Sequence, residues 1–429
     1  MSAAAPTTDI PDKLPPVAYL LAVALGIVGA VGGAIFLEIM HLLQNGYIND
    51  IPAALGWSEP PAWYVMAGLI VSVGIILLAR RLPGATGKSP LTGFHFDNPP
   101  RIAASILLAA LATLTFGASL GPEAPLIVVG TTLGGLLMRK AQPNIVTLAM
   151  FLAGIAAIGT IFGNPFITAF LLLEFVAMGA APKVILLPAL VALGAGYITQ
   201  IGWGAWTGFG LMTLTVPGLP AYPEISTGDL LTGVIVAFVA AALTAIAREL
   251  GQKVQAVSEK KPAWTLLSAG IVTGIVAIVV VAVFDVNYDQ ILFSGQTGMP
   301  DLVQETSIAA VIAIVIGKLI VYGIALGGGF RGGPIFPATF IGLGFGVFAS
   351  LVIDGISVSP MAAVGIAAAA TVMTRLPFTS GVIAMLLIGA SGVGIAPFAI
   401  IGAVGGVIAL QILDKFDTRK SGQVAPASA

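Results

Sequence analysis

The sequence contains no cysteine and only two histidines among 429 residues. The absence of cysteine excludes disulfide bonds and thiolate metal sites, and neither histidine stands in an HExxH pattern, so no metal site and no cofactor are predicted. No plausible pair of nucleophile and base faces across the apolar segments, which argues against an intramembrane enzyme and leaves no candidate catalytic residue. The net charge is −1, and the chain lacks the basic patch that binding of nucleic acid requires.

Charged residues are also scarce, at 9% of the chain, whereas soluble domains carry about 25%. The mean hydropathy is +1.04. Several stretches approach the ~20 apolar residues that a helix needs to cross a bilayer; they include Pro16 to Leu43, Trp63 to Ala79, Leu230 to Ile246, Trp264 to Phe284 and Ile308 to Ala325. Shorter runs, such as Leu126 to Met138 and Phe166 to Met178, predict tilted or half-crossing helices. The chain is therefore predicted to be an all-α membrane protein that contacts lipid.

Residues that interrupt helices are abundant, with 54 glycines and 28 prolines. Close helix packing and broken helices in membranes both draw on these residues, and backbone groups freed at membrane depth must then face protein or a wet cavity. The predicted fold is consequently polytopic and interrupted.

Lysine and arginine are unevenly distributed along the chain. They cluster at 80–88, 139–140, 248–261 and 415–420, and they are absent from 45–61 and 203–227. Because cytoplasmic loops carry an excess of these residues, the clusters and the C-terminus are predicted to be cytoplasmic. The N-terminal segment lacks the basic region and cleavage site of a signal peptide, so the first apolar segment is expected to stay as a helix. The predicted location is the cytoplasmic (inner) cell membrane, with multiple passes.

The chain carries an internal repeat. FGASLGPEAPLIVVGTTLGG and GGFRGGPIFPATFIGLGFGV share glycines and prolines at a constant offset of 212 residues. The matched pairs are Gly121 with Gly333, Pro122 with Pro334, Pro125 with Pro337, Gly130 with Gly342 and Gly134 with Gly346. The same offset joins Pro165 to Pro377, and GATGKSPL resembles GQTGMPDL at an offset of 211. Three segments that are marked by glycine and proline recur in the same order. This recurrence predicts two structural repeats.

The repeats set the predicted boundaries. They are a polar N-terminal tail (1–13), a first transmembrane repeat (14–204), an extracytoplasmic loop (205–225), a second transmembrane repeat (226–413) with a charged cytoplasmic loop at 248–262, and a polar C-terminal tail (414–429). Repeats in transporters are often inverted, with broken helices whose N-termini meet near the midplane.

Two Gly-Pro pairs, at 121–122 and 333–334, open apolar runs and predict helix starts, because proline is tolerated in the first turn. A helix N-terminus carries free amides and about half a positive charge, and this combination binds anions. Two such starts that point inward predict an anion pathway.

Glu123 stands at the first of these starts, in an otherwise apolar run, and it has two interpretations. As a structural cap it would accept amides of the first helical turn. As a pathway group it would compete with an anion for the same donors. Burial favours its protonated form and helix amides favour its ionised form, so protonation near neutral pH is a candidate switch. Its counterpart is Ile335, which makes the acid a specialisation of one repeat.

The GATGKS segment does not fit a P-loop, because Leu82 stands where the pattern requires glycine. Two interpretations remain for it: a loop at the membrane edge, or a turn whose Thr86 hydroxyl and nearby amides face the permeating ion.

Four further charged residues stand in or beside apolar runs. Glu174 is a possible secondary acid, although a carboxylate held by its neighbours at a helix end is the favoured interpretation. Lys318, Arg331 and Arg375 are predicted to be paired or cytoplasm-side charges rather than selectivity groups.

Together these motifs resemble those of the CLC family of chloride channels and chloride/proton antiporters, over about residues 16–413. The family's G-R-E-G-P, G-G-x-F-x-P and G-S-G-I-P elements compare with Gly121-Pro122-Glu123-Ala124-Pro125, Gly332-Gly333-Pro334-Ile335-Phe336-Pro337 and Thr86-Gly87-Lys88-Ser89-Pro90, the last with one extra residue. Its N-A-P-L-A-G run before paired glutamates resembles Asn164 to Thr168 followed by Glu174.

The resemblance implies a homodimer with one anion pathway per subunit, built from inverted repeats. Glu123 would be the external gate and a candidate proton acceptor, and the transported solute would be a small monovalent anion, above all chloride, with protons as a possible second substrate. The anion site would involve Thr86, Gly87, Gly121, Ala124, Gly333, Ile335 and Phe336.

The sequence departs from the family pattern at several positions. Phe175 stands where the antiporters carry a second glutamate as internal proton relay. Pro334 replaces a residue whose amide contributes to the anion site, and proline has no N–H. No tyrosine follows Tyr322, so the family's inner-gate tyrosine has no counterpart. The C-terminal cystathionine-synthase-type regulatory pair of many relatives is not expected either.

The predicted function is therefore passive or proton-linked movement of a small anion, gated by Glu123. Fluoride or another anion in the same fold remains an alternative. A secondary transporter for an organic or sugar substrate is another, although it would need a wider polar cavity than this sequence offers.

Overall fold

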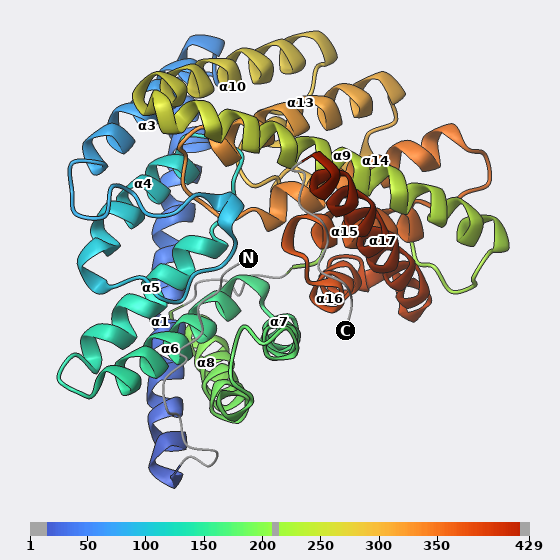
Figure 1. Ribbon diagram of the computed structural model, residues 1–429. Helices are drawn as coiled ribbons and strands as arrows, with labels where there is room; N and C mark the ends of the chain where they lie inside the picture. Colours follow the sequence, from blue (N-terminus) through green and yellow to red (C-terminus); the bar gives the residue numbers. More distant parts are fainter. Residues whose placement is uncertain (1–14, 208–213, 421–429) are drawn as a thin grey trace. The chain divides into compact units, whose positions relative to one another are not determined.

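A computed structural model describes residues 15–207 and 214–420. The predicted N-terminal tail, the end of the C-terminal tail and residues 208–213 of the predicted loop at 205–225 lie outside this range. Within it the chain forms helices and helical turns, and the only β-type pairing in the described part is an isolated bridge between Gly121 and Gly333 (Figure 1). The all-α prediction is confirmed.

The helices recur in one order in the two halves of the chain. The first half contains α1 (Pro16–Asn45), α2 (Ile51–Ala54), α3 (Ala62–Ala79), α4 (Ala103–Thr115), α5 (Glu123–Leu137), α6 (Pro143–Phe162), α7 (Pro165–Ala177) and α8 (Leu186–Thr207). The second half contains α9 (Thr227–Lys260), α10 (Pro262–Phe284), α11 (Tyr288–Ile291), α12 (Met299–Gln304), α13 (Ile308–Gly327), α14 (Ile335–Val352), α15 (Val358–Thr374), α16 (Pro377–Leu387) and α17 (Ala396–Lys420). The offset of 212 carries the starts of α5 and α7 onto those of α14 and α16.

Nine helical segments of the described residues are long and apolar enough to cross a bilayer. The runs that the sequence marked as short form α5, with 15 residues, and α7, with 13 residues. Neither is long enough to cross the ~30 Å hydrocarbon core at 1.5 Å per residue. The predicted mixture of full and short helices is confirmed.

One local prediction was wrong. Residues 248–260, expected as part of a charged loop, are the last turns of α9. The segment combines strong helix formers, such as Ala, Glu, Gln and Lys, with an i,i+4 ion pair between Glu249 and Lys253 at 2.9 Å. Charge density marked this segment as polar, but its propensity makes it helical.

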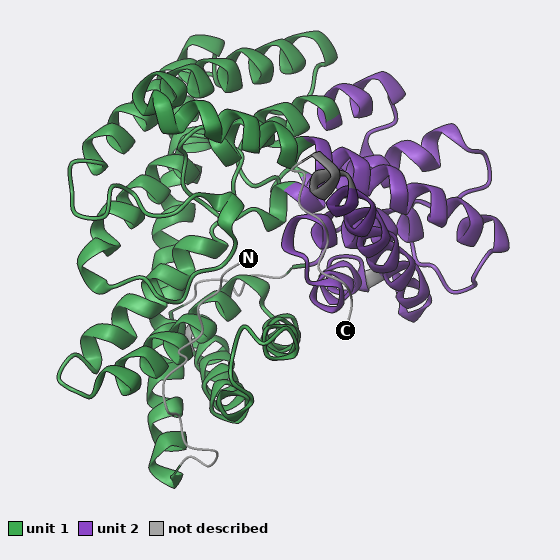
Figure 2. Cartoon of the chain, viewed as in Figure 1, with its two compact units in different colours: residues 1–214, 247–298, 316–337 green, residues 215–246, 299–315, 338–429 purple. Residues whose placement is uncertain are grey.

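The described residues divide into two compact units (Figure 2). Unit 1 comprises residues 1–214, 247–298 and 316–337, and unit 2 comprises residues 215–246, 299–315 and 338–429. The unit boundaries do not follow the sequence repeat, because unit 1 includes the first half of the chain together with the start of α14. Both predicted helix starts therefore belong to unit 1.

In unit 1, α6 is the centre of the packing. It contacts α1, α5 and α8. Of the residues in its 18-residue apolar stretch, 78% are buried, whereas only 33% are buried in the corresponding stretch of α10. Glycines on α5 make the contact with α6 close: a Cβ at Gly130 or Gly134 would overlap the carbonyl oxygen of Ala153 or Ala149. Small residues allow this approach of two backbones in a membrane, so α5 is held firmly.

Glycines also allow close helix packing in unit 2. Its α15 packs against α16 and α17. Gly342 on α14 and Gly365 on α15 face each other so closely that a Cβ on either would overlap the carbonyl of the other. The paired glycines thus fix α14 against α15.

Candidate functional site

The starts of α5 and α14 meet through their glycines. Gly121 donates its N–H to the carbonyl of Gly333 at 2.7 Å, and Gly333 donates its N–H to the carbonyl of Gly121. Such a reciprocal antiparallel pair has local two-fold symmetry. Because the two glycines are equivalent under the sequence repeat, the two helix starts are related by a local two-fold axis. The prolines at 122 and 334 precede the first helical residues instead of occupying the first turn as predicted.

Glu123 is the first residue of α5 and is fully buried. Its Oε1 accepts a hydrogen bond from the backbone N–H of Phe336 at 3.1 Å, and the nearby amides of Ile335 and of Glu123 itself also favour negative charge on the carboxyl group. These donors belong to the first turns of both helices. The carboxyl group therefore lies at the place where two helix N-termini converge, which is a favourable position for negative charge.

The carboxyl group fits only because glycines surround it. A Cβ added at Gly121 or at Gly333 would overlap Glu123 Oε2. Glu123 Oε2 is buried and has no hydrogen-bond partner within the described residues. An unpartnered carboxylate oxygen in an apolar site is costly.

Aromatic side chains from both repeats also lie at the site: Phe162 comes from the first repeat, and Phe336 and Tyr322 come from the second. Phe336 is fully buried, and its ring lies 6.2 Å from that of Phe162, centroid to centroid. The hydroxyl of Tyr322 donates to the carbonyl of Pro334 at 2.7 Å. Tyr322 thereby holds the residue that leads into α14. Nothing in the sequence predicts this bond, since a tyrosine within an apolar run has no distinguishing pattern.

Thr86 lies in a strained turn. Its φ is +72°, unusual for a β-branched residue, and it is fully buried. The N–H of Thr86 donates to Ser105 Oγ at 2.7 Å, and its carbonyl accepts from Arg331 Nε at 2.7 Å. Its Oγ1 has no partner within the described residues. Strain held in place by specific bonds, together with an unpartnered hydroxyl, is typical of a binding site.

Arg331 links this turn to the start of α14. Besides the bond to Thr86, its Nη2 donates to the carbonyl of Gly87 at 3.3 Å and its Nη1 to that of Phe330 at 2.9 Å. The prediction that Arg331 is a paired charge thus holds in a specific form, since its partners are backbone carbonyls. It ties the first-repeat turn to the second-repeat loop.

The predicted site residues fall into three groups. Gly121, Glu123, Gly333, Ile335 and Phe336 come together at the paired helix starts. Thr86 and Gly87 connect to that group through Arg331, and Ala124 lines a cavity beside it. Glu174 is buried near the end of α7.

Phe175 lies in an aromatic cluster. Its ring centroid is 6.3 Å from that of Phe94 and 6.2 Å from that of Phe96, and Phe96 also contacts Phe151. The position therefore presents apolar surface, which carries no proton.

The other predicted charges are paired. Lys318 is fully buried on α13 and donates to the carbonyls of Ile291, Leu292 and Phe293 at 3.2, 2.7 and 3.0 Å. Arg375, in unit 2, forms a bidentate ion pair with Asp414 at 2.7 and 2.8 Å. Both side chains therefore have partners, as the sequence predicted.

A helical membrane protein with a buried acid at two converging helix N-termini is the class that this fold and site define. The chain belongs to the CLC family: the model of the voltage gated chloride channel family matches residues 84–411.

Known proteins resemble the chain in sequence and in fold. The "Putative ion-transport protein YfeO" of Escherichia coli O6:H1 is 28% identical over 343 residues, covering 76% of this chain and 78% of that protein. A slow cyanobacterial Cl⁻/H⁺ antiporter superposes with a TM-score of 0.74 at 16% identity, covering 94% of this chain and 96% of the other. A CLC-type fluoride/proton antiporter gives a TM-score of 0.68 at 18% identity, covering 92% and 95%. The structural similarities show that the chain has the CLC fold.

Proposed function

We propose that the protein moves small monovalent anions, chloride above all, across a membrane through a pathway that passes the paired helix starts and is gated by Glu123. The observation that carries the proposal is the hydrogen bond from Phe336 N–H to Glu123 Oε1. An anion drawn to the start of α14 would use the same donor. The carboxylate and the anion are therefore mutually exclusive occupants.

Protonation supplies a way to open such a gate. An ionised Glu123 competes with the anion for the amides of Ile335 and Phe336. A protonated one has lost the charge that those amides favour, and its unpartnered Oε2 is a natural place for the proton. Flux should accordingly rise when protons are available.

Glu123 has two roles in this account. As the first residue of α5 it stands where a structural cap would stand, and its bond to the N–H of Phe336 in α14 matches a gate. A cap would need bonds only within α5. The contact across to the other repeat therefore favours the gate.

Passive conduction and proton-linked exchange differ in whether protons cross with the anion. The aromatic cluster around Phe175 supplies no internal proton acid at that position, which favours passive movement over exchange by that route. Fluoride is the second candidate ion, since one structural neighbour is a fluoride/proton antiporter and a site built from amides suits a small anion.

The assembly and location belong to the same proposal. The resemblance to the family implies a homodimer, and the charge distribution supports the cytoplasmic (inner) membrane, with Arg80, Arg81 and Lys88 on the cytoplasmic side. A transport role agrees with the family.

Liposomes that contain the purified protein, with a concentration gradient of chloride, fluoride, nitrate or an organic anion across the membrane, test the proposal. Chloride should leave protein-containing vesicles faster than empty ones, and the organic anion should not. A pH-sensitive dye inside the vesicles reports whether protons move with the anion. Absence of flux of every halide and of nitrate would contradict the proposed function.

A further inference from the structure

Unit 1 contains an open groove of about 310 Å³ where the end of α9, the start of α10 and α13 meet (Figure 1). Its lining comes from residues 254–261 at the end of α9 and in the turn after it, from residues 264–272 of α10, and from Ile324 of α13. Binding pockets begin at about 300 Å³. The groove is therefore large enough to hold part of a sizeable ligand.

The groove is cationic at one end and apolar along its length. Lys261 lies at the turn between α9 and α10, next to Trp264. From Trp264 to Val272 the groove follows α10 for eight residues, which is about 12 Å at 1.5 Å per residue. The far part of the groove is lined by Ala269, Val272 and Ile324. A molecule with a charged head and an apolar tail has the same division.

The cationic end of the groove lies at the level where lipid headgroups are expected. With 34 residues, α9 is about 51 Å long, whereas the hydrocarbon core of a bilayer is about 30 Å thick. Its charged last turns therefore extend beyond the core. Trp264 is 73% exposed in the first turn of α10, and tryptophan is enriched at the boundary between headgroups and hydrocarbon. The groove thus runs from headgroup level into one leaflet.

The charge of Lys261 is available to a headgroup. Lys261 is exposed and forms no ion pair with the described residues. The nearest acid along the chain is Glu259, to which Gln255 donates at 3.4 Å. Neither Glu259 nor Gln255 lines the groove, whereas Val254 and Val257 do. The lysine therefore brings an uncompensated positive charge to the apolar groove.

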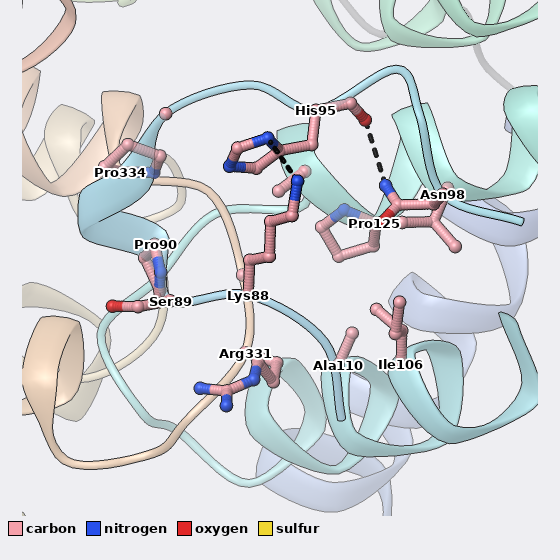
Figure 3. Close-up of a pocket in the computed structure, with 14 residues that line it drawn as sticks. Lys88, Ser89, Pro90, His95, Asn98, Ile106, Ala110, Pro125, Arg331 and Pro334 are labelled. Carbon is pink, nitrogen blue, oxygen red and sulfur yellow. Dashed lines mark hydrogen bonds between the residues drawn. The ribbon is translucent and has the colours of Figure 1, made fainter. Parts of the chain in front are cut away.

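A second cavity of unit 1 differs in size and in the state of its lysine. It measures about 50 Å³, and Lys88 lines it (Figure 3). Lys88 Nζ lies 3.1 Å from Asp97 Oδ2 and 3.1 Å from His95 Nδ1. Since an ammonium can only donate, His95 accepts at Nδ1, and its neutral ring donates from Nε2 to Thr92 Oγ1 at 2.8 Å. That cavity is too small for a lipid chain, and its lysine already has an acidic partner.

From these observations we propose that the groove binds one anionic phospholipid of the cytoplasmic leaflet, with the phosphate at Lys261 and an acyl chain along α10. The predicted orientation places this end of α9 on the cytoplasmic side. Residues 248–261 carry four cations and two acids, and an excess of basic residues at the membrane surface attracts anionic lipids. The inference is independent of the proposed function, because lipid binding requires no anion flux.

Native mass spectrometry of the full chain in detergent tests the role of the charge. Offered equal amounts of a phosphatidylglycerol and a phosphatidylethanolamine with the same acyl chains, the wild type should retain the phosphatidylglycerol preferentially. Lys261→Gln should lower this preference about fivefold, which is the effect of one basic residue near an anionic surface, and Lys261→Arg should keep it. Lys140→Gln removes the same charge from an exposed position outside the groove and should leave the preference unchanged.

Ser268→Phe tests the apolar part of the groove. Ser268 lines the groove and is exposed, so a phenyl ring at this position should fill the space and reduce retention of both lipids. Lack of a preference in the wild type, an unchanged preference in Lys261→Gln, or undiminished retention in Ser268→Phe would each overturn the inference. If Ser268→Phe changed the number of subunits in the assembly and left lipid retention intact, the groove would be a protein interface instead.

Discussion

The two equivalent helix starts have the same backbone and different side chains. Gly121 and Gly333 bond to each other symmetrically, yet the next equivalent pair is Glu123 in the first repeat and Ile335 in the second. The first repeat supplies the acid, and the second supplies the amide of Phe336 that it bonds to. Duplication thus provided a symmetric frame, and the proposed gate exists because the two halves of that frame diverged.

The segments that precede these helices show the same division. In the first repeat, the hydroxyl of Ser105 binds the N–H of Thr86 and leaves the Thr86 hydroxyl unpartnered. In the second, the ammonium of Lys318 binds three successive carbonyls that end at Phe293. In the first repeat the Thr86 hydroxyl has no partner within the described residues. In the second repeat the buried ammonium of Lys318 holds three successive carbonyls in place.

Lys318→Met should cause the largest loss of stability. The substitution keeps much of the side-chain volume but leaves three buried carbonyls without their donor, and each buried acceptor left unsatisfied costs about 1–3 kcal/mol. Thermal unfolding of the purified protein in detergent should show a clear decrease in the midpoint. An unchanged midpoint would mean that water replaces the ammonium and that the second repeat does not depend on it.

Ser105→Ala should cause a smaller loss, of about 1–3 kcal/mol, because one buried N–H, that of Thr86, loses its acceptor. The same unfolding measurement applies, with Ser268→Ala as the matched control, since Ser268 Oγ bonds only to carbonyls within its own helix. A loss as large as that of Lys318→Met would contradict the difference between the repeats.

His95 should have a still smaller effect on stability, through its titration. The corresponding segment of the second repeat contains no histidine. Burial, and secondarily Lys88, lower the pKa of His95 below 6.5, although Asp97 opposes them. The unfolded chain therefore binds this proton more readily than the folded one. Stability should fall as pH decreases through and below 6.5, and His95→Gln should remove that part of the dependence. A stability that rises on acidification would contradict the assignment of a neutral ring.

The sequence predicted the features that depend on local patterns. The two Gly-Pro pairs predicted the starts of α5 and α14, and the constant offset indicated the repeat. An acid within an apolar run identified Glu123 as a candidate. These signals are local because glycine, proline and charge have strong effects on their immediate neighbours.

Long-range bonds were beyond the reach of such patterns. Arg331 and Thr86 are 245 residues apart, and nothing near either residue indicates the other. Lys318 and Tyr322 have partners that are backbone carbonyls, which every residue possesses. The helical end of α9 was missed for a different reason, since its charges suggested a loop while its propensities favoured a helix.

The pH dependence of anion flux in Glu123→Gln tests the central claim most directly. Glutamine has nearly the shape of the protonated acid and cannot ionise, so it should not compete with an anion for the amides at α14. Chloride efflux from liposomes should rise on acidification in the wild type and be nearly independent of pH in the variant. A variant that retains the wild-type pH profile would contradict the claim and reduce Glu123 to a structural cap.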